Sequence, residues 1–248
     1  MNKLKVSIVT ISFNNESDIR ETIESVINQS YDNIEYIVVD GASTDGTLGI
    51  INEYHDKIDK IISEPDEGQY DAINKGIRKT TGDIVGLIHA GDKLYDNQVI
   101  KKIAVHFSSN DIDAMYGHAK IIDLNGKIRM INRSPNFSKI LVRAGWMPSH
   151  QSIYIKRAIF EELGYYRNDL GGSGDYEFFI RYFYFYNLKV KRLNEYILWF
   201  KLGGRSNQGF LSKFKSFKTF KKCWEINGKI SSRLMVPFKL FWKIPQIT

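Results

Sequence analysis

Cysteine is almost absent from this chain of 248 residues, which contains Cys223 and no other. A single thiol excludes an internal disulfide and a zinc cluster built from thiolates, and it favours a reducing, cytosolic setting. Long apolar runs are missing as well, since no stretch approaches the roughly 18–20 residues that a membrane-spanning helix needs. The short apolar run after the basic start is interrupted by Ser7, Thr10 and Ser12, so we expect a first strand there rather than a signal peptide.

Acidic side chains are scarce in residues 209–248, which hold nine Lys or Arg and one acid, Glu225. The whole chain has 35 basic and 28 acidic residues, so residues 1–208 hold 26 and 27. The net charge of +7 therefore belongs to the tail, which indicates a local anionic partner.

Aromatic residues in the tail recur at three- and four-residue steps and predict an amphipathic helix. They are Phe210, Phe214, Phe217, Phe220 and Trp224. One interpretation places residues 210–244 on an anionic membrane, where each basic residue contributes about 1 kcal/mol. The other packs the aromatic face on the core. No nucleic-acid module signature accompanies these residues, so we expect no nucleic-acid partner.

The first ninety residues alternate strand and helix patterns, which predicts an α/β fold with a parallel sheet between helices. We expect strands at residues 5–11, 34–39, 60–63 and 84–88, and helices at 18–28, 47–55 and 70–79. The second half is less regular, with a hairpin at 114–122 and 127–131, a strand at 152–155, helices at 156–163 and 175–186, and an extended stretch at 190–199. The one boundary is near residues 207–209, giving a domain at 1–208 and an extension at 209–248.

Polar clusters follow the predicted strands at residues 13–16, 40–47, 64–71 and 89–92. Open α/β sheets bind ligands beyond the carboxyl ends of their strands, so a site is expected there. A carboxylate such as Asp40 accepts hydrogen bonds from a base or ribose, although residues 40–47 also suit a well-capped turn with no ligand. The first strand is not followed by G-x-G-x-x-G, which disfavours a dehydrogenase.

Five segments in series closely resemble the inverting family 2 glycosyltransferases of the GT-A fold: TISFNNE (10–16), DGASTDGT (40–47), SEPDEGQYDAINKG (63–76), TGD (81–83) and IHAGD (88–92). Within that family the chain is most similar to short bacterial enzymes that build exopolysaccharide and O-antigen units, such as the colanic acid type. The resemblance covers roughly residues 5–205. It implies a Rossmann-like, mixed and mostly parallel sheet flanked by helices, here with the basic helical extension.

The resemblance also implies residue roles in a nucleotide pocket. The residues that it places in or beside this pocket are Thr10, Phe13, Glu16, Asp40, Asp66, Asp71, Asn74 and Lys75. Lys75 is equally compatible with a solvated helix position.

The segment from His89 through Gly91 to Asp92 stands where the family has its Asp-x-Asp metal motif. A divalent cation neutralises the charge that grows on a departing diphosphate, and Mg²⁺ or Mn²⁺ prefers oxygen ligands. Asp92 is the expected ligand, and a turn cap is its structural alternative. His89 replaces the first acid of the motif, so its part in binding is open.

Asp175, after a glycine-rich loop, matches the position of the family's general base, with the helix cap as a structural role and Glu177 as second candidate. His150 and Gln151 match a segment facing the sugar or acceptor, with a structural role as the alternative for His150. Arg205, in a late Gly-Gly-x-Ser segment, is a candidate contact to the diphosphate and equally compatible with a solvated position.

These roles together imply a hexosyl- or N-acetylhexosaminyltransferase. The donor would be an NDP-sugar, with UDP expected, and the acceptor a lipid-linked saccharide. Transfer would invert the anomeric configuration, during surface polysaccharide synthesis at the inner face of the plasma membrane. A non-catalytic sugar-nucleotide-binding or membrane scaffold protein is one alternative. A nucleotidyltransferase is another, disfavoured because residues 12–16 lack glycine and basic side chains.

Overall fold

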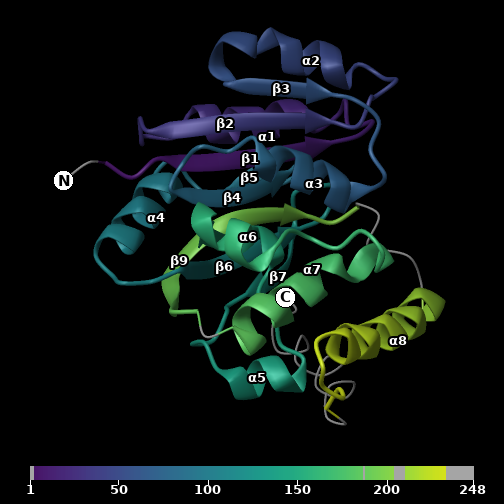
Figure 1. The fold of residues 1–248 in the computed structure, drawn as a ribbon. Coiled ribbons are helices and arrows are strands. Elements are labelled where there is room, and N and C mark those ends of the chain that lie inside the picture. The colour runs from purple at the N-terminus through teal and green to yellow at the C-terminus, as the bar shows by residue number, and fades with distance from the viewer. Residues whose placement is uncertain (1–2, 187, 204–209, 233–248) are drawn as a thin grey trace.

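A computed structural model describes residues 3–186, 188–203 and 210–232, with the side chains of 210–217 outside the description. Its first half is a parallel sheet with crossover helices (Figure 1). The strands are β1 (Val6–Ser12), β2 (Ile34–Asp40), β3 (Lys60–Ser63) and β4 (Ile84–His89). The helices are α1 (Ile19–Ile27), α2 (Thr47–Glu53) and α3 (Gln69–Arg78), with a 3₁₀ turn, η1 (His55–Lys57).

The register of these strands brings their carboxyl ends to one edge of the sheet. Ser12 pairs with Asp40, and Asp40 pairs with Ser63. On the other side of β1, Ile11 pairs with His89. The polar segments that follow the four strands therefore start side by side, as the sequence pattern predicts.

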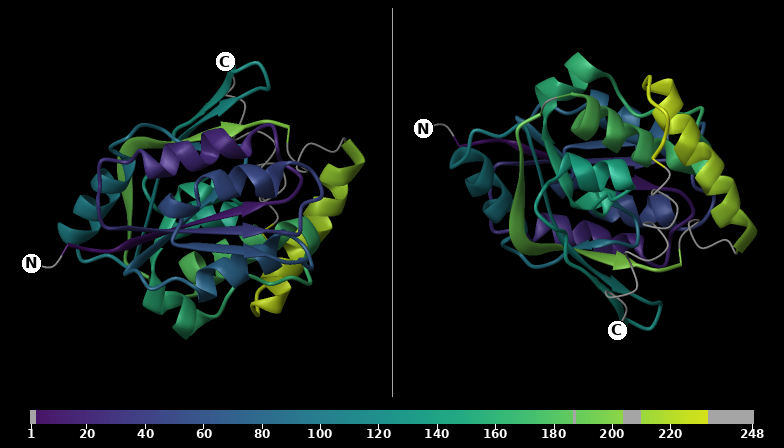
Figure 2. Two further views of the ribbon diagram at one scale, coloured as in Figure 1. Left: turned by 90° about the horizontal axis from the view of Figure 1, so that it is seen from above. Right: turned by 90° about the horizontal axis from the view of Figure 1, so that it is seen from below.

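The second half extends the same sheet, in the order β3-β2-β1-β4-β8-β6-β9-β5, with β7 paired to β6. Its strands are β5 (Lys93–Leu94), β6 (Ala114–Ile122), β7 (Ile128–Asn132), β8 (Ile153–Lys156) and β9 (Val190–Lys201). Because β8 is antiparallel to both β4 and β6, β6 and β9 run in the direction of β4. They end at the same edge, and the β6–β7 hairpin projects from the body of the molecule (Figure 2).

The remaining helices are α4 (Val99–Ser108), α5 (Lys139–Ala144), α6 (Arg157–Leu163), α7 (Gly174–Ile180) and α8 (Phe210–Ile226). Short 3₁₀ turns occur at η2 (His150–Ser152) and η3 (Gly171–Ser173), and a π-helical turn, η4, spans Arg181–Phe185. Helices α1, α2 and α4 contribute to the apolar core on one face of the sheet, and α3, α5, α6, α7 and α8 to the core on the other. The predicted mixed sheet flanked by helices is confirmed.

Helices α4 and α5 have no counterpart among the predicted elements, and one predicted helix divides in the structure. Residues 99–108 were not predicted as a helix, yet α4 buries Val99, Ile100, Ile103 and Phe107 at helical spacing. The single helix predicted for 175–186 divides into α7 and the π turn, whose Tyr182 and Phe183 are buried among other aromatic rings. Aromatic packing decides the second case, since local propensity does not favour a π turn.

The predicted tail helix is present as α8, and its described aromatic residues pack inward. Trp224 is fully buried, and its indole N–H donates to the Tyr176 hydroxyl at 3.0 Å. The Phe220 ring lies 4.7 Å from that of Tyr176. For these two residues the core-packing interpretation applies. The side chains of Phe210, Phe214 and Phe217, the proposed boundary at 208, and residues 233–248 lie outside the described part. Among the described helices, none is long and apolar enough to cross a membrane.

Candidate active site

The loops after β1 and β2 are joined by hydrogen bonds at the carboxyl edge of the sheet. The Asn14 backbone N–H donates to Ser43 Oγ at 2.9 Å, and the Thr44 N–H donates to Asn14 Oδ1 at 2.8 Å. Glu16 accepts from the Gly46 N–H at 3.0 Å. Asn14 and Ala42 adopt left-handed φ angles of 49° and 58°, a conformation that costs roughly 1–2 kcal/mol for a residue with a Cβ. The paired loops therefore hold a strained shape.

Asp40 and Thr10 lie behind this surface, with no exposed area. The Asp40 carboxylate accepts from the Ser43 N–H at 3.0 Å, from the Ser43 hydroxyl, and from Ser63 Oγ at 2.8 Å. Thr10 Oγ1 lies 3.0 Å from the Tyr36 hydroxyl. Both residues thus support the edge in this structure, and their direct contact with a nucleotide stays a prediction.

Phe13 and Asp66 line the outer surface beside Gly41. The Phe13 side chain is 51% exposed. A Cβ at Gly41 would lie 2.8 Å from Asp66 Oδ2 and 3.3 Å from Phe13 Cδ2, so a glycine is needed for this approach. An open aromatic face next to a carboxylate suits a nucleobase, which stacks and donates hydrogen bonds.

Lys75 is the centre of an acidic cluster rather than a solvated residue. Its ammonium lies 2.8 Å from Asp66, 3.1 Å from Asp71 and 3.1 Å from Glu64, and it donates to the Pro65 carbonyl at 2.7 Å. Burial lowers the pKa of Lys75, but hydrogen bonds to the three acids outweigh it and raise the pKa overall. Lys75 therefore fixes the loop that carries Asp66. Asn74 instead bonds the backbone of Tyr166 through both ends of its amide.

Asp92 is buried at the end of β4, with 5% of its surface exposed. Its Oδ1 accepts from the Lys201 N–H at 2.7 Å and its Oδ2 from Gln151 Nε2. Gln151 Oε1 in turn accepts from the His89 N–H at 2.7 Å. Burial raises the pKa of Asp92 to about 7, and the two hydrogen bonds offset only part of that effect. Gly91, with φ at +99°, makes the turn that positions Asp92.

His89 and His150 stand edge to face, with ring centroids 4.8 Å apart. Nε2 of each ring is buried and has no hydrogen-bond partner in the described part of the chain, and Ser12 Oγ is in the same state. Burial lowers the pKa of both histidines, so both are neutral at pH 7. Unsatisfied buried polar atoms are costly, and these three belong to the last residues of β1 and β4 and the first residue of η2. They indicate that a polar ligand completes the site.

Asp175 lies in the first turn of α7, on the far side of His150. Its Oδ1 accepts from the Tyr70 hydroxyl at 3.2 Å and from the Tyr176 N–H at 2.7 Å. A Cβ at Gly174 would lie 2.7 Å from the Tyr70 ring, so this glycine permits the approach of α7 to α3. The negative charge of Asp175 opposes the fall in the pKa of His150 that burial causes.

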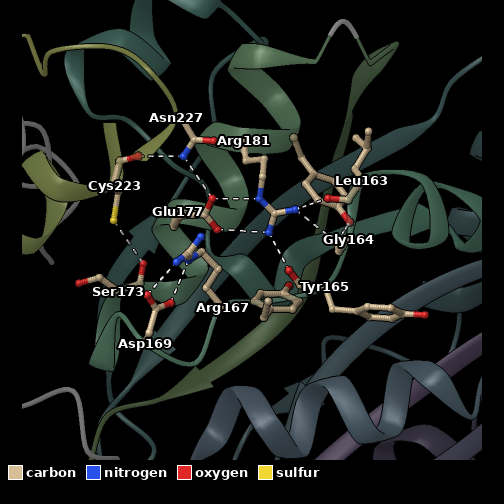
Figure 3. A network of polar contacts seen from close by, with 12 residues as sticks. Leu163, Gly164, Tyr165, Arg167, Asp169, Ser173, Glu177, Arg181, Cys223 and Asn227 are labelled. Atoms are coloured by element: carbon tan, nitrogen blue, oxygen red, sulfur yellow. Dashed lines mark hydrogen bonds and ion pairs between the residues drawn. The ribbon is translucent and has the colours of Figure 1, made fainter. Parts of the chain in front are cut away.

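Glu177, the second candidate base, is held in a network of hydrogen bonds and an ion pair that connects parts of the fold (Figure 3). It is buried, and its carboxylate pairs with Arg181 at 2.9 and 3.2 Å and accepts from Asn227 Nδ2 at 3.2 Å. Arg181 also donates to the Tyr165 carbonyl at 2.7 Å. This network joins α7 to the segment after α8, and the geometry favours Asp175 over Glu177 as a base. Arg205, the predicted diphosphate contact, lies outside the described residues.

The Asp92 carboxylate fits a cation whose other oxygen ligands come mainly from a bound diphosphate and water. Within the described ranges, no three His, Cys, Asp or Glu side chains gather as a metal cluster. Asp92 still has a lone pair on each oxygen beyond its two hydrogen bonds, and a cation would relieve the cost of ionising it. A single carboxylate suits Mg²⁺ or Mn²⁺ when phosphates and water complete the shell. A surface hollow of about 340 Å³ between α1 and β5 shares no residue with this site.

Sequence reasoning missed Tyr70, Ser12 and Lys201 as parts of the site. Tyr70 stands within the quoted segment 63–76 and Ser12 within 10–16, so a signal was present. Lys201 contributes a backbone N–H, which no sequence pattern reveals.

Polar side chains gathered at the carboxyl edge of an α/β sheet stand where open sheets of this type bind their ligands. The model of the family described as "Glycosyl transferase family 2" matches residues 7–169. This chain belongs to that family, as the sequence segments predict. The match ends before Asp175.

Relatives agree with this assignment, and solved structures share the fold. An uncharacterized glycosyltransferase of Mycobacterium tuberculosis (strain H37Rv) is 30% identical over 71% of this chain and 68% of its own length. A PGL/p-HBAD biosynthesis glycosyltransferase of Mycobacterium bovis BCG is 28% identical over 71% and 69%. The fold is similar to that of S. aureus TarS in complex with UDP-GlcNAc, with a TM-score of 0.74, 16% identity, and 95% and 72% of the two chains covered. It is also similar to the mannosyltransferase PcManGT from Pyrobaculum calidifontis in complex with GDP-Man and Mn²⁺, with a TM-score of 0.67, 16% identity, and 98% and 73% covered.

Proposed function

We propose that this glycosyltransferase moves a hexose or N-acetylhexosamine from an NDP-sugar, with UDP favoured, to a lipid-linked saccharide, with inversion. The observation that carries the proposal is the group of polar side chains at the carboxyl edge of the sheet. Gln151 bonds both Asp92 and the His89 backbone, the His89 ring packs against His150, and the charge of Asp175 acts on His150. Asp92 suits a diphosphate and its cation, and Asp175 suits an acceptor hydroxyl.

The nucleotide end of the donor would lie over Phe13 and Asp66, with its sugar near His89 and His150. The neutral imidazoles offer their buried Nε2 atoms to sugar or ribose hydroxyls, which both donate and accept. The solved relatives named above hold UDP-GlcNAc or GDP-Man, which supports a sugar nucleotide without choosing the base.

Asp175 would take the proton of the acceptor hydroxyl as the oxygen attacks the anomeric carbon. The bond from that carbon to the phosphate oxygen breaks, and the nucleoside diphosphate leaves from the opposite face. Single displacement inverts the configuration, and a single carboxylate suffices for it. Mg²⁺ or Mn²⁺, bound through Asp92 and the phosphates, would neutralise the charge on the leaving group. Tyr70 holds Asp175 in orientation by its hydrogen bond to Oδ1.

The acceptor and location follow from chemistry and relatives together. The excess of basic residues after residue 208 suits an anionic membrane, and one group of relatives carries the description PGL/p-HBAD biosynthesis glycosyltransferase. We therefore place the enzyme at the inner face of the plasma membrane, in cell-envelope polysaccharide synthesis.

A thermal-shift screen of UDP-, GDP- and dTDP-sugars with and without Mn²⁺ tests the proposal. A true donor raises the melting temperature by mass action, and Mn²⁺ should increase that rise. The donor that binds is then incubated with a saccharide acceptor, and the anomeric configuration of the product is assigned by NMR. Binding without turnover would favour the scaffold alternative, and a retained configuration would refute single displacement.

A further inference from the structure

Two isoleucines stand almost fully in solvent on neighbouring segments of the described surface. Ile140 on α5 and Ile230 after α8 are each 80% exposed, more than any other large apolar side chain whose exposure is described. Arg143 joins their segments, since its guanidinium donates to the Ile230 carbonyl and lies 4.6 Å from the centre of the Trp224 ring. Arg143 thus brings α5 next to the last turn of α8, and both helices lie toward the same end of the molecule (Figure 1).

Further apolar and basic groups surround this pair. Lys229 lies 5.1 Å from the Tyr184 ring centre, which brings the segment after α8 against the π turn. Tyr186, at the end of that turn, is 44% exposed, and Ile226 is 38% exposed. We define the docking strip as Lys139, Ile140, Arg143, Tyr186, Ile226, Lys229 and Ile230.

The charge around the strip is mainly positive. Residues 133–150 include no Asp or Glu, and neither do residues 226–232. The nearest acid in the chain of α8 is Glu225, which is accompanied by Lys221 and Lys222. Protruding aliphatic side chains among cations match the interface of an anionic bilayer, where the apolar groups enter the lipid and the cations meet headgroups.

The aromatic face of α8 cannot serve this purpose in its described part, because Phe220 and Trp224 pack on α7. We propose that the docking strip, rather than that aromatic face, seats the enzyme on an anionic lipid bilayer. The benefit of such seating, access to a lipid-linked acceptor, rests on the proposed function, but the docking itself does not.

Vesicle sedimentation of the full chain tests the proposal. Wild-type protein should bind phosphatidylcholine vesicles that contain phosphatidylglycerol, bind pure phosphatidylcholine at least about 10-fold less, and be released by salt. The double variant Ile140→Glu/Ile230→Glu should lower the partition coefficient by at least about 10-fold, because it removes apolar contact and adds repulsion. The variant Lys139→Gln/Lys229→Gln should reduce binding to anionic vesicles and leave weak binding to neutral ones unchanged.

The matched control is Val105→Glu/Leu124→Glu. Val105 on α4 and Leu124 in the β6–β7 turn are 55% and 70% exposed and lie outside the strip. Wild-type binding by Ile140→Glu/Ile230→Glu, or an equal loss in the control, overturns the proposal. The proposal is also overturned if the wild-type protein does not bind vesicles but forms dimers that Ile140→Glu/Ile230→Glu abolishes. Failure of sugar transfer in every assay, with strip-dependent vesicle binding intact, would count against the proposed function alone.

Discussion

Two buried acids, Glu35 and Asp92, lie toward opposite ends of the same sheet and show opposite electrostatics. Glu35 is 3% exposed near the start of β2, and Asp92 is 5% exposed just past the end of β4. Glu35 accepts from Ser7 Oγ at 2.6 Å and from the backbone and hydroxyl of Thr81 at 2.7 and 2.8 Å. Burial would raise the pKa of Glu35, yet these bonds and Lys60 outweigh it and lower the pKa to about 2.

Asp92 receives only two hydrogen bonds, and burial raises its pKa to about 7. Both side chains are hidden from solvent, but Asp92 lies deeper in the protein and receives fewer hydrogen bonds, so its pKa is raised where that of Glu35 is lowered. The charge of Glu35 is balanced by donors within the protein, as expected of a residue that stabilises the fold. The charge of Asp92 is only partly balanced, and the same region holds three polar atoms, on Ser12, His89 and His150, that lack a partner among the described residues. The comparison separates the edge that stabilises from the edge that binds.

The largest effect is expected from Asp175→Asn at the binding edge. Loss of a general base should lower the transfer rate by about 10²–10⁴-fold, while donor binding stays near wild type. Steady-state transfer and calorimetric binding measure the two quantities. Glu177→Gln is the control, because it should lower the melting temperature more than it lowers the activity of the folded fraction. Full activity of the Asp175 variant would remove it from the mechanism.

Asp92→Asn should cost at least about 100-fold in transfer and abolish the increase in donor affinity that Mn²⁺ produces. Stability should be unchanged or higher at pH 8. The folded pKa is raised, so an ionised Asp92 costs free energy above pH 7, and the amide avoids that cost. Urea denaturation at pH 8 measures this. A clear loss of stability would mean that ionised Asp92 stabilises the fold as Glu35 does, and the proposed difference between the two acids would be wrong.

Glu35→Gln should have the converse result, a loss on the order of 2 kcal/mol in unfolding free energy at pH 7 with transfer by the folded enzyme retained. The folded pKa is lowered from 4.5 to about 2, so the contribution of Glu35 is present above pH 4.5 and disappears as the pH falls toward 2. Urea denaturation across this range should show wild type and variant converging at low pH. A constant difference between them would assign the loss to packing instead of charge.

The smallest effect is expected at Ala42, the strained residue of the binding edge. Ala42→Gly should raise the unfolding free energy by up to about 1 kcal/mol, because glycine accepts a φ of +58° without its steric cost. Gly49→Ala, within α2, is a control for the general effect of exchanging these residues. If Ala42→Gly destabilises the protein, the strain is absent and the binding edge is more relaxed than its dihedral angles indicate.

Much of the fold was predictable because it depends on local pattern. The β1–β4 half alternates apolar strands with amphipathic helices, and its polar segments fall at the strand ends, so the position of the site followed. Helix α4 and the π turn were missed because their form depends on packing. The serial motifs located Asp92, His89, His150 and Asp175, but could not show that Glu177 is bound to Arg181 or that Lys75 holds three acids.

Sequence alone determined the class of fold, the edge that carries the site and the identity of the acids there, since apolar periodicity and strand order follow from the order of residues. Tertiary structure alone decided which acid is satisfied by hydrogen bonds and where Phe220 and Trp224 of the tail helix pack. Hydrogen-bond donors reach Glu35 and Asp92 from residues 25 to 109 positions away, and Trp224 meets Tyr176 across 48. Such contacts exist only once the chain has closed on itself, because burial and pairing are properties of neighbours in space.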